Sequence, residues 1–232
     1  RAPQIVLGVS QNTMGYYRQL RDLRGKKIGI MGPGSASHRV ARLLLARARL
    51  SAQEVQYISL PNAVSAVEAF RGGKIDAICY TDPVITALEQ GGALRVVADT
   101  RTVRGNAEVF GGPMPAGSLI ASTEFIGSHP RLCQAMTDAM VHALKWLQTA
   151  GPSDIIKTVP ERYFQGDRAL YLAAFSRARE AWAPDGVMPE RGPDTAARVL
   201  AQFDDTARLQ RVDLARTFTN EFARKAKAKY RA

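Results

Sequence analysis

The sequence predicts an α/β protein with a parallel sheet in its first half and a helix-rich second half. Three observations predict it. Short apolar runs alternate with helical patterns between residues 28 and 98, the glycine pairs Gly72-Gly73 and Gly91-Gly92 end two of the helices, and the pattern after residue 122 is helical. Strands that alternate with single helices form parallel sheets with right-handed crossovers. The 232 residues, 46% of them hydrophobic, suffice for one large domain or two smaller lobes.

Hydrophobic periodicity and helix-capping residues place the individual elements. Residues 100–117 show no periodic pattern, and the methionines of the first long C-terminal helix fall on an apolar stripe that we expect to be core. The expected strands are Gln4–Ser10, Ile28–Met31, Glu54–Leu60, Ile75–Tyr80, Leu94–Ala98 and Ser118–Ser122. The expected helices are Ala36–Leu50, one that begins after Asn62, Pro83–Gln90, Ser128–Gly151, Asp167–Trp182, Pro193–Phe203 and one that begins at Asp213.

A glycine turn, Gly32-Pro33-Gly34, between a strand and a helix is the first candidate binding feature. The first turn of a helix has backbone N–H groups without intrahelical acceptors and carries partial positive charge, so it favours an anionic or strongly polar ligand. A serine there also caps the helix without touching a ligand, and on local grounds capping is the preferred interpretation. The candidate ligand-binding residues of this turn are Gly34, Ser35, Ala36, Ser37 and His38.

A second candidate turn follows the strand that ends at Tyr80. Asp82 and Pro83 have the arrangement of a capping aspartate with proline at the first helical position. Both turns follow strands of the expected parallel sheet, and such sheets bind ligands beyond the carboxyl ends of their strands. Because of this shared edge, we prefer a binding role over simple capping for the first turn. For Asp82, helix capping and contact with a cationic group of a ligand carry equal weight. The candidate residues of this turn are Tyr80, Thr81, Asp82 and Pro83.

The chain is strongly basic, with a formal net charge of +11 and a sequence pI near 10. Its basic residues are scattered rather than gathered with aromatics on one element, so the pattern does not favour nucleic-acid binding. No apolar run reaches the roughly 18 residues of a membrane span. Cys79 and Cys133 are expected to be free core residues, with a disulfide as the alternative. No metal or cofactor is expected, because the three histidines lack zinc-ligand spacing.

Several phrases together resemble one protein family, the periplasmic solute-binding proteins of ABC importers. The branch in question includes nitrate-, sulfonate- and taurine-binding proteins and thiamine-pyrimidine-precursor proteins. Leu23–Ile30 (LRGKKIGI) resembles the entry to their second lobe, and Ala66–Ala77 (AVEAFRGGKIDA) resembles a later segment of that lobe. Leu119–Phe125 followed by His129-Pro130 looks like the return to the first lobe. The order and spacing of these phrases cover most of the chain.

The resemblance implies a periplasmic-binding-protein-like fold with two lobes that close on a solute. Residues 1–20 are expected to hold the last strand of lobe one and the hinge, residues 21–115 the α/β solute-binding lobe two, and residues 116–232 a return hinge strand and the C-terminal helices of lobe one. Family members carry a further segment ahead of this point, so we expect the N-terminal part of lobe one to be missing here.

The resemblance also implies a function. We expect a binding protein, not an enzyme, that delivers a small polar or anionic solute to an ABC transporter permease. It also implies a location in the periplasm, or a lipid anchor outside the cytoplasmic membrane. Two alternatives stay open. One is an enzyme of the same fold similar to pyrimidine-precursor synthases, although no cysteine-rich segment or Gly-x-Ser-x-Gly motif is present. The other is an effector-sensing domain of a regulator.

Overall fold

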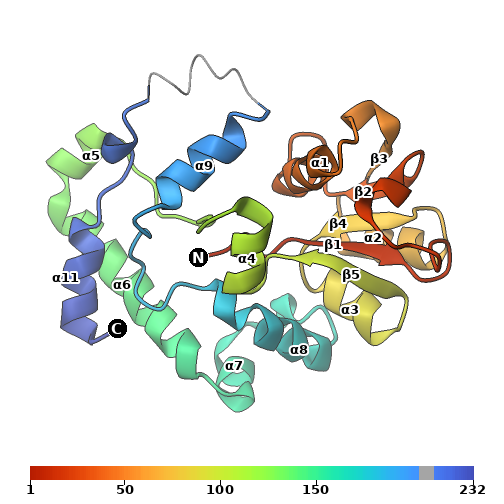
Figure 1. Cartoon of the computed structure of the whole chain (residues 1–232). Coiled ribbons are helices and arrows are strands. Elements are labelled where there is room, and N and C mark those ends of the chain that lie inside the picture. The colour runs from red at the N-terminus through yellow and green to blue at the C-terminus, as the bar shows by residue number, and fades with distance from the viewer. Residues whose placement is uncertain (204–211) are drawn as a thin grey trace.

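The computed structural model describes residues 1–203 and 212–232, and Figure 1 shows a small twisted sheet covered by helices and continued by a run of further helices. The strands are β1 (Val6–Ser10), β2 (Lys27–Ile30), β3 (Gln56–Ser59), β4 (Ala77–Tyr80) and β5 (Leu94–Asp99). The helices of the sheet region are α1 (Ala36–Arg47), α2 (Ala63–Arg71), α3 (Val84–Gln90) and α4 (Val103–Phe110). Those that follow are α5 (Thr123–Ser128), α6 (Pro130–Thr149), α7 (Pro152–Thr158), α8 (Arg168–Ala178), α9 (Gly192–Leu200) and α11 (Glu221–Tyr230). Short 3-10 turns are η1 (Leu20–Leu23), η2 (Ala52–Glu54), η3 (Glu161–Tyr163), η4 (Arg179–Ala181) and η5 (Leu214–Arg216).

The five strands form one mixed sheet in the order β3-β2-β4-β1-β5. β2 is parallel to both β3 and β4, which confirms the predicted parallel sheet for these three strands. β1 is antiparallel to both β4 and β5. β5 therefore runs in the same direction as β4, as expected, but the antiparallel β1 lies between them and makes the sheet mixed.

The position of β1 corrects a second expectation. Residues 4–10 were expected to end the other lobe, but β1 lies inside this sheet between β4 and β5. All five of its residues are buried. A short run that is apolar on both faces suits a strand covered on both sides, as β1 is here.

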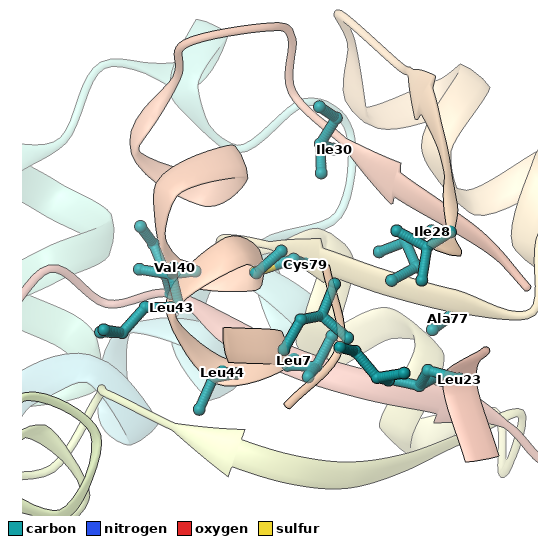
Figure 2. Packing of buried hydrophobic residues seen from close by; sticks show 14 of the residues in the cluster. Leu7, Leu23, Ile28, Ile30, Val40, Leu43, Leu44, Ala77 and Cys79 are labelled. Atoms are coloured by element: carbon teal, nitrogen blue, oxygen red, sulfur yellow. The ribbon is translucent and has the colours of Figure 1, made fainter. Parts of the chain in front are cut away.

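Helices cover the sheet on both faces. Leu7, Val9 and Cys79 lie on the face that packs against α1, and Figure 2 shows this cluster between α1 and the strands. The alternate residues Val6 and Ile78 lie on the opposite face. There they join a second cluster that includes Phe70 of α2 and Ile85 and Leu88 of α3. The alternation follows from the two-residue period of a strand. Cys79 and Cys133 are free and buried, as predicted.

The region after β5 differs from the prediction in three places. α4 lies within residues 100–117, where no periodic pattern was found; Thr102 caps its start, and Gly111, in the left-handed region with φ of 70°, follows its end. Ser118–Ser122 forms no strand, and its apolar side chains are exposed, including Ile120 at 87%. A strand needs a neighbour to satisfy its backbone hydrogen bonds, and no described residue pairs with this segment. Asp213 caps only η5, and the last helix, α11, begins at Glu221.

The methionine stripe of α6 is exposed, which overturns the expectation that it is core. Leu132, Met136 and Met140 are 48%, 45% and 52% exposed. α6 packs against α11 with a different face, on which Gln134 donates a hydrogen bond to the carbonyl of Phe222. Within the described residues, no helix is long and apolar enough to cross a membrane.

Candidate functional site

The turn after β2 is held in place by hydrogen bonds from the start of α1. Gly34 adopts a left-handed conformation, with φ of 74°, that glycine takes without strain. The hydroxyl of Ser35 caps the helix by accepting the backbone N–H of His38 at 3.2 Å. The backbone N–H groups of Ala36 and Ser37 follow this cap, and no acceptor for them occurs in the described ranges 1–203 and 212–232. These two donors form the anion-favouring start of α1.

Ser37 is part of the scaffold of this turn. It is fully buried, and its hydroxyl accepts the backbone N–H of Met31 at 3.0 Å and lies 3.0 Å from the hydroxyl of Ser35. The end of β2 is thus tied directly to the first turn of α1. The hydroxyl of Ser37 is thus already used by Met31, and its contact with a solute stays a prediction.

His38 lies at the edge of the same turn. Its Nδ1 accepts the backbone N–H of Gly34 at 3.0 Å, so in the neutral ring the proton is on Nε2. Burial, and then the charge of Arg42, lowers the pKa of His38. The imidazole contacts the ring of Tyr57 edge-on, with centroids 4.5 Å apart. A neutral imidazole in this position has one N–H donor left for a ligand.

The turn after β4 has two structural anchors. Tyr80 is 5% exposed, and its hydroxyl donates to the carbonyl of Leu60 at 2.8 Å, so its ring packs in the second core cluster. Oδ1 of Asp82 accepts both the backbone N–H and the hydroxyl of Thr86, at 2.9 and 2.7 Å. Asp82 therefore caps the first turn of α3 through Thr86, but the helix begins at Val84 and Pro83 is its N-cap residue, one position earlier than predicted. Thr81, Asp82 and Pro83 are partly exposed.

The sheet brings the two turns together. β2 and β4 are adjacent and parallel, with Ile28 opposite Ala77 and Gly29 opposite Ile78. The segment after β2 and the segment after β4 consequently leave the sheet at the same edge, as the sequence predicted. Gly34, Ser35, Ala36 and His38 lie on one of these segments, and Thr81, Asp82 and Pro83 lie on the neighbouring one.

Two nearby residues were not singled out from the sequence. Tyr57 of β3 contacts His38, burial raises its pKa to about 12, and its buried hydroxyl has no partner among the described residues. Arg101 follows β5 and donates to Asp82 at 3.3 Å. The signal for Arg101 was its place three residues after the expected strand Leu94–Ala98, but a lone arginine in a segment without periodicity does not stand out.

Two hollows in the structure lie away from these turns. One of about 590 Å³ lies between α6 and α11 and is lined by Gln134, Asp138 and Lys225 among others. The other, of about 340 Å³, lies between α1, β5 and α4. No group of three or more potential metal ligands occurs in the part of the chain that the structure describes.

Comparison with known proteins decides the family. A model of the NMT1-like family matches residues 10–159, which is more than half of the chain. The chain belongs to the NMT1-like family. A protein of known structure from Bordetella bronchiseptica RB50 is 44% identical over all of this chain, with a TM-score of 0.89. This member of the NMT1-like family spans 73% of that protein. A search of curated protein sequences gave no significant match.

More distant structures share the fold of this NMT1-like protein. The periplasmic aliphatic sulphonate-binding protein SsuA from Escherichia coli matches 95% of this chain and 70% of its own, with 17% identity and a TM-score of 0.70. The desulfurization enzyme DSZB matches 98% of this chain and 76% of its own, with 15% identity and a TM-score of 0.56. The predicted periplasmic-binding-protein fold and the resemblance to the solute-binding family are confirmed.

Proposed function

We propose that this NMT1-like protein is the solute-binding component of an ABC importer. It captures a small polar or anionic solute of the sulfonate, taurine, nitrate or pyrimidine-precursor class and passes it to a transporter permease. The solute lies in a cleft between two lobes, with residues 21–115 supplying one wall and helices of residues 116–232 belonging to the other. The protein works in the periplasm or on a lipid anchor outside the cytoplasmic membrane.

The start of α1 carries this proposal. The unaccepted backbone N–H groups of Ala36 and Ser37 and the Ser35 cap lie where a sheet of this class binds ligands. Gly34 leaves the approach open, because a Cβ built on it would meet no atom within 4 Å. Several fixed donors around one oxyanion bind it without any covalent step, which suits capture and release.

The enzyme alternative is weaker because Cys79, one of the two buried thiols, is not an activated nucleophile. DSZB shows that the fold also hosts an enzyme. Nucleophilic cysteines have lowered pKa values and partial exposure. Cys79 has the opposite properties: it is fully buried, and burial raises its pKa.

A pair of matched substitutions tests the proposal. Ser35→Asp keeps a capping oxygen for the His38 N–H but puts a negative charge where the anionic group would bind. Ser122 caps α5 in the same way, accepting the N–H of Phe125 at 3.1 Å, so Ser122→Asp is the control. Binding of nitrate, ethanesulfonate, taurine and pyrimidine precursors is measured by calorimetry and by thermal shift on the complete protein.

We expect one class of solute to raise the melting temperature of the wild type. Ser35→Asp should lower the affinity for that solute at least tenfold while the protein stays folded, and Ser122→Asp should bind it with the affinity of the wild type. Normal binding by Ser35→Asp would remove the start of α1 from the site. Loss of the bound solute with formation of a product would establish an enzyme instead.

A further inference from the structure

Arg101 is a buried arginine whose donors are all directed at carboxylates. It is 3% exposed and lies between β5 and α4. Nε donates to both oxygens of Asp99 at 3.0 and 3.1 Å, and Nη2 donates to Asp99 at 2.7 Å and to Glu89 at 3.2 Å. Nη1 donates to Glu89 at 3.2 Å and to Asp82 at 3.3 Å. A guanidinium has five N–H donors, and these contacts leave none for a solute.

This cluster lies at the same sheet edge as the candidate site. Val6 of β1 is the register partner of both Tyr80 and Asp99, so β4 and β5 end at equivalent places on either side of β1. Asp82 follows the first of these strand ends, and Asp99 is the second. Arg101 binds both Asp82 and Asp99 and therefore links the end of β4 to the end of β5.

The contacts fix the carboxylate of Asp82 from two sides. Oδ1 accepts both donors of Thr86, and Oδ2 accepts Arg101. The side chain of Asp82 is 11% exposed, so it reaches the surface only in part. A carboxylate has about four acceptor positions, and Oδ2 keeps one that these bonds do not use. The direction of that remaining position is set by the guanidinium.

The charge balance also depends on Arg101. The cluster has three carboxylates, Asp82, Glu89 and Asp99, and two guanidiniums. Arg101 binds all three carboxylates, and Arg177 of α8 binds Glu89 at 2.7 Å. Arg177 is 44% exposed, whereas Arg101 is in the interior. Without Arg101, Asp82 and Asp99 would lose their only ion-pair partner among the described residues. Lysine cannot replace it fully, because a single ammonium lacks the planar fork that bridges several carboxylates.

We propose that Arg101 is the positioning residue of the candidate site, holding Asp82 so that one carboxylate position faces a hydrogen-bond donor of the solute. The proposal rests on the proposed function and extends it to a residue that touches no solute. It predicts that Arg101 matters for solutes that carry an N–H donor and matters little for those that do not.

Two probes that differ in one group test this selectivity. Taurine and ethanesulfonate share a sulfonate, and only taurine has an ammonium. Their affinities are measured by calorimetry on the complete protein for wild type, Arg101→Lys, Asp82→Asn and the double variant. Arg104→Met is the matched control, since Arg104 is an arginine three residues away whose side chain is 90% exposed and pairs with Glu108.

We expect Arg101→Lys and Asp82→Asn each to lower the affinity for taurine at least tenfold and the affinity for ethanesulfonate less than threefold. The double variant should bind taurine no worse than Asp82→Asn, because Arg101 acts through Asp82. Arg104→Met should bind both probes as the wild type does. Equal losses for both probes, or additive losses in the double variant, would overturn the positioning role.

A second measurement needs no solute. The backbone N–H of Thr86 is bound by Asp82, so its hydrogen exchange reports how firmly the carboxylate is held. We expect exchange at least tenfold faster in Arg101→Lys than in wild type and Arg104→Met. Unchanged exchange would refute the positioning role. If the wild type bound neither probe, the choice of sulfonate as solute class would fall, while the exchange of Thr86 would still decide the role of Arg101.

Discussion

Replacing Ser37 by alanine should destabilise the protein through the backbone of the neighbouring strand. The Ser37 hydroxyl is fully buried and accepts the N–H of Met31 at 3.0 Å. Its removal leaves a donor at the end of β2 without an acceptor, which costs about 1–3 kcal/mol. Alanine has the better helix propensity, by about 0.5 kcal/mol, and offsets part of this loss. We expect a net decrease of about 1–2 kcal/mol in the free energy of unfolding.

Equilibrium denaturation in urea measures this change. The midpoint should fall while the slope stays the same, because the surface exposed on unfolding is nearly unchanged. For a chain of this size the melting temperature should fall by about 2–8 °C. Ser153→Ala is the control: Ser153 is an exposed serine in the first turn of α7, where the same substitution should change stability by less than about 0.5 kcal/mol. An unfolding midpoint equal to that of wild type would refute the view that Ser37 ties β2 to α1.

Three further predictions concern pH, packing and thiol reactivity. Burial and Arg42 lower the pKa of His38, so the folded chain binds fewer protons there than the unfolded chain, whose histidine pKa is about 6.5. This contribution to stability is complete above that pH and is lost as the pH falls through the folded pKa; urea midpoints at pH 7.5 and 5 should therefore differ more in wild type than in His38→Gln. Phe70→Ala should lower the free energy of unfolding by about 3–5 kcal/mol, because Phe70 is 1% exposed, whereas Val64→Ala, at a position 67% exposed, should be nearly neutral in the same assay. Burial raises the pKa of Cys79, so a thiol reagent followed by mass spectrometry should label it in denaturant and not in the native protein.

Local signals predicted the candidate turns well. Ser35 caps α1 and Asp82 caps α3, because a hydroxyl or carboxylate before an apolar helical pattern satisfies the same N–H groups in most contexts. The parallel arrangement of β2, β3 and β4 could equally be predicted from the sequence, since each strand is joined to the next by one helix. Their common edge then placed both turns together. The identity of a solute stays a prediction.

The failures concern contacts that a local sequence pattern does not specify. β1 was misplaced because its apolar run fits any buried strand, and nothing local shows that β4 and β5 flank it. The stripe of Leu132, Met136 and Met140 has the period of a core face, yet no described element covers it. Arg101 was overlooked for another reason: its carboxylates are near in sequence, but no local pattern shows that Asp82, Glu89 and Asp99 meet at one guanidinium.

The place of β1 between β4 and β5 has a consequence for the order in which the protein can fold. β1 leaves the ribosome before the other strands of this sheet, and its two neighbours, β4 and β5, are made only after the chain has passed β2, α1, β3 and α2. At roughly 5–20 residues per second, β1 waits several seconds for its first partner. During that time its apolar faces and both of its backbone edges are unprotected. A chaperone that holds the nascent chain should therefore raise the yield of this protein most when it binds residues 4–10.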